Sequence, residues 1–179
     1  MKKVAVFLAE GFEEIEALTV VDIMRRAGVT CHMIGVEKIN VLGAHNIEVK
    51  CDKTLDEDIK DYDLIVLPGG MPGARNLQNN DKVIETVKYF YENDKLVSAI
   101  CAAPIVLGTA QIIDGKNITS YPGFEEELKG CNYKEDRVVV DKNIITSRGP
   151  ATAMEFAYKL LEMLGNDKYK EISSGMLYK

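Results

Sequence analysis

The chain lacks an excess of basic residues, and it lacks any apolar run of membrane-spanning length. Lys and Arg number 22 against 28 Asp and Glu, which gives a formal net charge of −6. Because nucleic acids and anionic membranes are bound through clustered Lys and Arg, this composition argues against both as partners. No apolar run approaches the roughly 20 residues that cross a bilayer. No small-residue cleavage site follows the start, so we expect a cytoplasmic protein that is not secreted.

The sequence also lacks paired cysteines and is poor in histidine. The four cysteines are Cys31, Cys51, Cys101 and Cys131, and no two of them form a C-x-x-C pair. A cytosolic chain of this size needs no disulfide, so we expect free thiols. The two histidines, His32 and His45, would need further ligands to hold a metal, and the pattern indicates none. We therefore expect one core histidine, one surface histidine, and neither a metal nor an organic cofactor.

The rest of the sequence predicts a single α/β domain over residues 1–179. The chain is 46% hydrophobic, which is enough for one well-buried core. Apolar runs predict strands at Val4–Leu8, Thr30–Val36, Asp63–Leu67, Leu96–Ile100 and Asn117–Tyr121, with hairpins within Lys38–Cys51 and across Val138–Ser147. Helical spacing predicts helices at Ala17–Met24, Val83–Tyr91, Ile105–Ile112 and Ala157–Leu164, and a helical turn at Phe124–Lys129. This alternation favours a flavodoxin-like or Rossmann-like fold, with a mostly parallel sheet covered on both faces.

Cys101 is predicted to lie on the turn between a strand and a helix. It follows the apolar run Leu96–Ile100, and Pro104, which favours the first turn of a helix, comes three residues later. A thiol at this place faces unpaired backbone N–H groups and the positive end of the helix dipole, which stabilise a thiolate. Most free cysteines are small buried hydrophobes, but this position favours a nucleophile.

Other motifs fall at the same edge of the predicted sheet. Glu10-Gly11, Gly69-Gly70 and Arg148-Gly149 each follow a predicted strand, and sites in such sheets lie beyond the carboxyl ends of the strands. Gly69-Gly70 can be a simple tight turn, or it can free backbone N–H groups of Gly70 and Ala102 to hold an oxyanion. The acids Glu13, Glu14 and Glu16 all lie in one helical turn, where the dipole alone favours carboxylates. The residues alone do not choose among these acids.

The chain closely resembles the ThiJ/PfpI family, in particular its DJ-one branch with the bacterial relatives, nearly end to end. The resemblance is carried in order by Glu10–Glu16, Val21–Gly28, Leu67–Gly70, Ala99–Pro104 and Thr146–Pro150. It implies a flavodoxin-like three-layer sandwich of the class I glutamine amidotransferase type, a homodimer, and a reactive Cys101. The carboxyl partner in the family corresponds to Glu16, which keeps a proton beside the cysteine sulfur because two neighbouring anions are disfavoured.

The resemblance further implies a function for this site. Similar proteins are glutathione-independent glyoxalases or deglycases that act on small 2-oxoaldehydes such as methylglyoxal, or on early glycation adducts. Gly69, Arg26, Tyr121 and Arg148 would then contact the substrate, with Gly70 and Ala102 as the oxyanion donors. Redox sensing and chaperone-like behaviour under oxidative stress are also ascribed to similar proteins, through the same cysteine.

Three departures from the family pattern narrow this expectation. Tyr121 stands where the branch often has a histidine, and Asn46 stands where it has an anion-binding arginine. Ala102 follows the cysteine, whereas the peptidase-like members have a histidine there, and no histidine lies C-terminal to Cys101. Protease and amidotransferase chemistry need an imidazole base near the thiol. The sequence therefore favours an aldehyde-directed enzyme over a peptidase.

Overall fold

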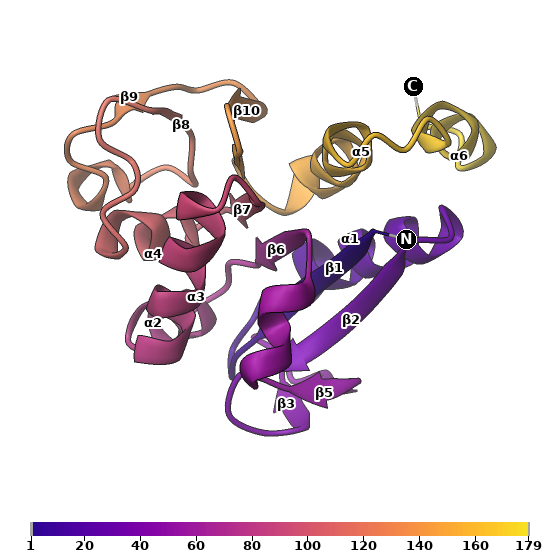
Figure 1. The fold of residues 1–179 in the computed structure, drawn as a ribbon, viewed down its shortest axis with the longest axis horizontal. Coiled ribbons are helices and arrows are strands. Elements are labelled where there is room, and N and C mark those ends of the chain that lie inside the picture. The colour runs from indigo at the N-terminus through magenta and orange to yellow at the C-terminus, as the bar shows by residue number, and fades with distance from the viewer. Residues whose placement is uncertain (1, 179) are drawn as a thin grey trace.

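The computed structural model describes residues 2–178 and has a seven-stranded central sheet, in the order β10-β11-β7-β6-β1-β2-β5 (Figure 1). The pairs from β11 to β5 are parallel, and β10 is antiparallel to β11. The strands are β1 Lys3–Leu8, β2 Thr30–Gly35, β5 Lys53–Thr54, β6 Leu64–Leu67, β7 Leu96–Ile100, β10 Val138–Asp141 and β11 Ile144–Ser147. This confirms the predicted flavodoxin-like α/β class.

Two small sheets stand apart from the central one. The antiparallel pair is β3 Asn40–Leu42 with β4 Glu48–Lys50, and the parallel pair is β8 Asn117–Ile118 with β9 Asn132–Tyr133. The helices are α1 Glu14–Arg26, α2 Gly73–Gln78, α3 Asp81–Glu92, α4 Pro104–Thr109, α5 Ala153–Met163 and α6 Tyr169–Gly175, with 3₁₀ turns η1 Glu57–Asp61, η2 Glu125–Glu127 and η3 Pro150–Thr152. In the described part of the chain, no helix has the length and apolar character needed to cross a membrane.

Alternation along the buried strands divides the core into two layers. Val4, Val6 and Leu8 of β1 pack with residues of α1 and α5, whereas Ala5 and Phe7 pack on the other face with residues of α2, α3 and α4. Successive side chains of a strand point to opposite faces, so a continuous apolar run serves both layers. Figure 1 shows α2, α3 and α4 to the left of the sheet and α5 to its right.

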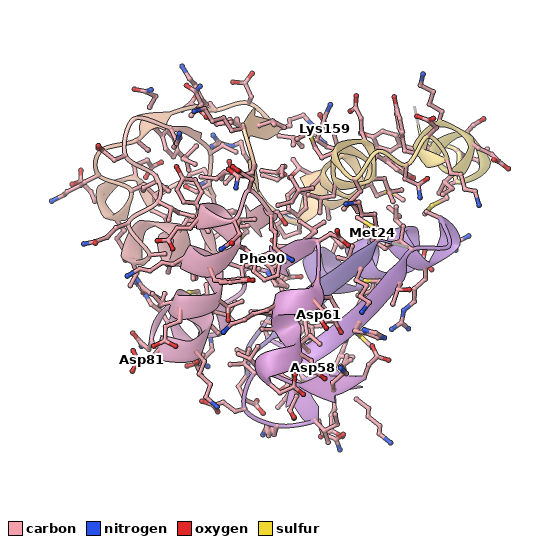
Figure 2. The ribbon with its side chains drawn as sticks, in the orientation of Figure 1. Met24, Asp58, Asp61, Asp81, Phe90 and Lys159 are labelled. Carbon is pink, nitrogen blue, oxygen red and sulfur yellow. The ribbon has the colours of Figure 1, made fainter. Side chains whose placement is uncertain are left out.

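Apolar side chains fill the two layers of the core, and most charged side chains lie on the surface. Met24 of α1 and Phe90 of α3 are fully buried, each in a different layer of the core. Asp58 and Asp81 are exposed, and Figure 2 shows Asp81 at the left edge of the molecule. Met24 and Phe90 both come from the faces that the helical spacing marked as apolar.

Most predicted elements are present, and the differences have local causes. The predicted helix Ile105–Ile112 ends at Thr109, because Gln111 adopts a φ of 59° that an α-helix does not allow. The predicted strand Asn117–Tyr121 is shortened to Asn117–Ile118 and pairs with β9 rather than with the central sheet. The helical turn predicted at Phe124–Lys129 is the 3₁₀ turn η2. The short helix α2 was not predicted, since its six residues are too few to show a periodic pattern.

Candidate active site

Cys101 occupies a strained elbow between β7 and α4. Its φ of 64° lies in the left-handed region, which a residue with a Cβ adopts only when its surroundings hold it there. The Cys101 N–H donates to the carbonyl of Ser147 at 2.9 Å, and the Cys101 carbonyl accepts from the N–H of Tyr121 at 2.8 Å. The elbow is thus fastened on both sides, and it presents a half-buried thiol at the carboxyl edge of the sheet.

Glu16 reaches this thiol from the first turn of α1. Its side chain is fully buried, its Oε2 accepts the Gly69 N–H at 2.7 Å, and its carboxyl interacts with the Cys101 thiol. Glu16 Oε1 is buried and has no hydrogen-bond partner within residues 2–178. An enclosed carboxyl oxygen without a partner can bind a proton or a polar group of a substrate. The structure therefore brings together the two residues that the resemblance paired.

Burial controls the ionisation of the pair. It raises the pKa of Glu16 to about 7, although the Gly69 N–H and the Cys101 thiol act against this rise. Burial also raises the pKa of Cys101, and so does the neighbouring Glu16, while the N–H groups of Ala102 and Gly70 act against it. This corrects the expectation that the helix start alone would favour the thiolate. Desolvation and the carboxyl outweigh the two N–H groups, and the pair keeps a proton near neutral pH.

Gly69 and Gly70 let the loop after β6 pass close to the elbow. A Cβ on Gly69 would lie 2.7 Å from the Cys101 Cβ and 2.8 Å from Glu16 Oε2, so any side chain there would enter the site. Gly70 has a φ of 85°, and a Cβ on it would overlap the backbone of the segment before α1. The Gly70 and Ala102 N–H groups both hydrogen-bond to the Cys101 sulfur. Two backbone donors are therefore available beside the thiol.

Tyr121 and Arg148 lie on the side of the elbow opposite Gly69. Tyr121 is 48% exposed, and a Cβ on Gly149 would lie 3.2 Å from its ring. Arg148 follows Ser147, the residue that accepts the Cys101 N–H. Its Nη1 is buried and has no hydrogen-bond partner among the residues described. An unpaired buried guanidinium nitrogen is suited to donate a hydrogen bond to an anionic group.

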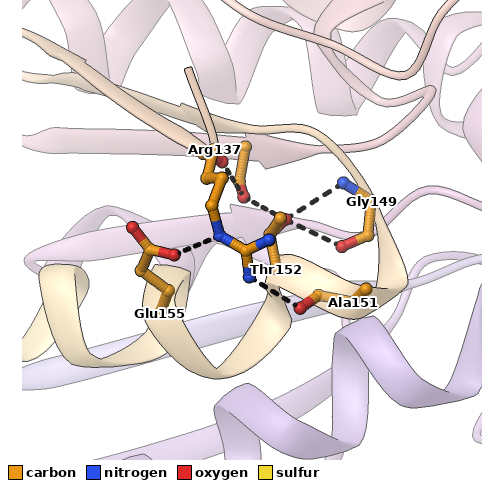
Figure 3. Close-up of polar contacts among 6 residues, drawn as sticks. Arg137, Gly149, Ala151, Thr152 and Glu155 are labelled. Atoms are coloured by element: carbon orange, nitrogen blue, oxygen red, sulfur yellow. Dashed lines mark hydrogen bonds and ion pairs between the residues drawn. The ribbon is translucent and has the colours of Figure 1, made fainter. Parts of the chain in front are cut away.

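A network of polar contacts fixes the segment that carries Arg148 (Figure 3). Thr152 Oγ1 accepts the Gly149 N–H at 3.1 Å and donates to the Gly149 carbonyl at 2.9 Å. Arg137 donates to Glu155 Oε2 at 2.6 Å and to the Ala151 carbonyl at 3.1 Å. These contacts tie η3 and α5 to the strand β10 region, so the turn after β11 has a defined course beside the elbow.

Arg26 is not brought to the thiol within one protomer. It lies in the last turn of α1, ten residues after Glu16, which is about 15 Å along the helix. Arg26 Nε donates to Asp22 Oδ2 at 2.6 Å, and both side chains are about half exposed. Asn46, at the position of another anion-binding residue of the family, lies in the β3–β4 hairpin with a φ of 62°. A substrate role for Arg26 stays a prediction.

One group of potential metal ligands occurs among residues 2–178. Glu13, Glu14 and His45 each offer an atom, and these atoms lie within 4.8 Å of one another. His45 Nδ1, however, is already hydrogen-bonded to Glu14 at 2.8 Å, so we interpret the group as a hydrogen-bonded ion pair. The sequence showed His45 only as a surface residue and gave no signal of this pairing, because the hairpin and α1 meet only in the folded chain. His32 is half-buried, with its Nδ1 at 2.6 Å from the Tyr62 hydroxyl.

Comparison with known structures places the fold among the DJ-1 proteins. The structure titled "Toxoplasma gondii DJ-1, oxidized" has a TM-score of 0.94 and 37% identity, with 99% of each chain covered. A crystal structure of a cysteine-to-alanine mutant of a DJ-1 superfamily protein from Salmonella typhimurium has a TM-score of 0.95 and 33% identity, with 100% of each chain covered.

Comparison of sequences gives the same grouping. "Protein DJ-1 homolog B" of Arabidopsis thaliana is 41% identical over 98% of this chain, which spans only 41% of that longer protein. "Protein dj-1beta" of Drosophila melanogaster is 36% identical over 98% of this chain and 97% of its own length. The profile of the DJ-1/PfpI family matches residues 2–163. The chain therefore belongs to the DJ-1/PfpI family, as the resemblance of its motifs predicted.

Proposed function

We propose that the protein is a cofactor-free enzyme that converts small 2-oxoaldehydes such as methylglyoxal, or their early adducts, into 2-hydroxy acids. The observation that carries this proposal is the pairing of Cys101 with the buried carboxyl of Glu16, with two N–H groups facing the sulfur. Such a site supplies a nucleophile, a proton carrier and oxyanion donors side by side. Membership of the DJ-1/PfpI family supports a reactive-cysteine function of this kind.

The first step forms a hemithioacetal. The Cys101 sulfur uses a lone pair to bond to the aldehyde carbon, and the Glu16 carboxylate takes the thiol proton. The electron pair of the carbonyl π bond moves to oxygen, where the N–H groups of Gly70 and Ala102 hold it. Glu16 then returns the proton to this oxygen. A carboxyl with a pKa of about 7 exchanges protons in both directions near neutral pH.

The second step moves a hydrogen between adjacent carbons. Glu16 removes the hydrogen of the former aldehyde carbon as a proton, and the electron pair left behind forms a double bond to the neighbouring carbon. Glu16 gives this proton to the former ketone oxygen, which forms an enediol. Glu16 then takes the proton of the former aldehyde hydroxyl and delivers it to the neighbouring carbon: the O–H electron pair re-forms the carbonyl π bond, the C=C electron pair binds the proton, and a thioester on Cys101 results. Water hydrolyses this thioester to the 2-hydroxy acid and the free thiol. One carbon is oxidised as the other is reduced, so the reaction needs no external electron carrier.

The test is lactate formation from methylglyoxal by wild type, Cys101→Ser and Glu16→Ala. We expect each variant to lose at least about a hundredfold in kcat, because removal of a nucleophile or a general acid–base group costs on this order. Glu126→Gln, in the exposed acidic run of η2, is the matched control and should keep the wild-type rate. Equal rates in wild type, Cys101→Ser and Glu16→Ala would refute the proposal.

A second candidate function is redox sensing or a chaperone-like stress response that begins with oxidation of Cys101. Cys31 and Cys51 are buried, which restricts the access of peroxide to their thiols. Cys101 and Cys131 are half-buried, but only Cys101 has two N–H groups beside its sulfur that would bind a sulfinate oxygen. Two equivalents of hydrogen peroxide supply the two oxygen atoms of a sulfinic acid and leave as water. Peptide mass mapping after mild peroxide should find the first two oxygens on Cys101, and prior oxidation of another cysteine would count against this function.

A homodimer in the cytoplasm completes the proposal. Four exposed apolar side chains lie on elements near the site: Ile15 of α1, Leu42 and Ile47 of the β3–β4 hairpin, and Met71 of the loop before α2. Hydrogen bonds join these elements: Gly11 N–H donates to Leu42 O, and Gly73 N–H donates to Gly11 O. Exposed apolar side chains on adjoining elements mark an interaction surface. We call Ile15, Leu42, Ile47 and Met71 the apolar face, and assign a second copy of the chain as its occupant.

A further inference from the structure

Glu14 is a buried carboxylate that the proposed reaction does not use. It is 4% exposed, in the first turn of α1, and it points away from Glu16 toward the tip of the β3–β4 hairpin. Its Oε1 accepts the backbone N–H of His45 at 2.8 Å, and its Oε2 lies 2.8 Å from His45 Nδ1. Gly43 leaves room for this carboxyl, since a Cβ there would overlap the Glu14 side chain. One carboxylate thus holds both the backbone and the ring of His45.

Further hydrogen bonds join the hairpin tip to the segment before α1. Ala44 N–H donates to the Phe12 carbonyl at 2.8 Å, and Gly11 N–H donates to the Leu42 carbonyl at 2.8 Å. The N-cap residue of α1, Glu13, makes no side-chain capping hydrogen bond. The start of α1 is therefore held by the hairpin rather than by its own cap.

The same segment is bonded to the loop that lines the site. Glu13 N–H donates to the Gly69 carbonyl at 2.9 Å, and Gly69 N–H donates to Glu16 Oε2 at 2.7 Å. Gly69 in turn lies against Cys101, because a Cβ on it would be 2.7 Å from the Cys101 Cβ. A continuous series of contacts therefore leads from His45, which is on the surface, through Glu14 and Glu13 to the buried pair.

Electrostatic interactions also connect His45 to the buried pair. Glu13 Oε2 lies 3.6 Å from His45 Nδ1, and the hydrogen bond to Glu14 raises the pKa of His45, as do the charges of Glu13 and Glu14. The charge of Glu13 also contributes to the raised pKa of Glu16. Within the buried pair, Glu16 and Cys101 each change the pKa of the other. Glu13 is the further titratable group that acts on the pair, through Glu16. His45 faces Glu13 and Glu14 from the hairpin.

We propose that Glu14 and His45 are positioning residues for the reaction: by fastening the β3–β4 hairpin to the start of α1, they hold Glu16 and the Gly69–Gly70 loop in place around Cys101. The expected loss of kcat rests on the proposed function, whereas the placement of Glu16 and of the Gly69–Gly70 loop does not. Displacement of Glu16 would remove a group that acts on the thiol, whether or not the protein consumes methylglyoxal.

The test uses His45→Ala, His45→Asn and Glu14→Ala, with Glu126→Gln as the control. Asn keeps a side-chain N–H donor near the position of Nδ1 but carries no charge, so it separates positioning from charge. The His45 side chain is 67% exposed, so both His45 variants should fold even if Glu14→Ala does not. The readouts are the pH dependence of Cys101 alkylation by iodoacetamide, followed by peptide mass mapping, and kcat and KM for lactate formation.

In His45→Ala and Glu14→Ala we expect the midpoint of Cys101 alkylation to move to lower pH, because Glu16 raises the pKa of the thiol in the wild type. We also expect kcat to fall at least tenfold with KM within about twofold, as for groups that act only in the transition state. His45→Asn should restore both. An unchanged alkylation profile in His45→Ala, or a His45→Asn variant as impaired as His45→Ala, would overturn the inference. A shifted profile in a protein that forms no lactate would uphold positioning and refute only the proposed function.

Discussion

At the scale of single residues, side-chain direction decides which of three neighbouring buried acids serves the cysteine. Glu13, Glu14 and Glu16 share one helical turn, yet Glu16 points toward Cys101 and Glu14 points toward His45 of the β3–β4 hairpin. Ile15, between them, is 56% exposed although it is apolar. A charged residue inside and an apolar one outside reverse the usual amphipathic pattern. Departures of this kind are expected at functional sites, where local preference gives way to chemistry.

The burial of Glu16 predicts a pH-dependent loss in the free energy of unfolding. Between the ordinary glutamate pKa and about 7, the folded chain holds a proton on Glu16 that the unfolded chain releases. Stability should therefore decrease as pH rises through this window, by up to about 3 kcal/mol. Glu16→Gln removes this titration. The free energy of unfolding of the variant, minus that of wild type, should therefore increase between pH 5 and pH 8.

Urea unfolding at unit pH steps measures this difference. The comparison cancels other titrating groups, because they are common to both proteins. A constant difference between wild type and Glu16→Gln across the range would show that Glu16 ionises alike in the folded and unfolded states.

At the scale of elements, some helix N-termini are stabilised by side-chain caps and others by tertiary contacts. Asn80 caps α3 through its Oδ1, which accepts the Val83 N–H at 3.2 Å. Asn80→Ala should lower the free energy of unfolding by about 1 kcal/mol, since the Val83 N–H loses its acceptor. Glu85→Ala, on the exposed side of the same helix, is the control and should change stability little. Urea denaturation of both variants measures this, and equal losses would show that the cap contributes nothing.

The same scale shows what the sequence could predict. Val4–Leu8 and Asp63–Leu67 were recognisable as strands because burial on both faces makes the whole run apolar. The ends of α4 and β8 were not, because they depend on the φ of Gln111 and on pairing with β9. Cys101 could be singled out from its strand and proline, whereas its partner required the resemblance. The contacts of His45 with Glu14 join residues 31 positions apart, and no local pattern records them.

At the scale of the whole molecule, the apolar face predicts self-association. Ile47→Glu should shift the proposed dimer toward monomer, because it places a charge on a surface that would lose its water. Light scattering coupled to size-exclusion chromatography measures the mass. Leu177→Glu is the matched control, since Leu177 is 84% exposed and does not belong to the apolar face. A wild-type protein that elutes with the mass of one chain would refute the dimer.

The two-layered core has a consequence for when reactivity arises. Glu16 belongs to α1, which packs on one face of the sheet, and Cys101 leads into α4, which packs on the other. The pair exists only when both layers have closed on the strands between them. A newly made or partly unfolded chain would carry an ordinary thiol and an ordinary glutamate. The reactivity of Cys101 therefore depends on completed folding, because it requires residues from both layers of the core to be packed together.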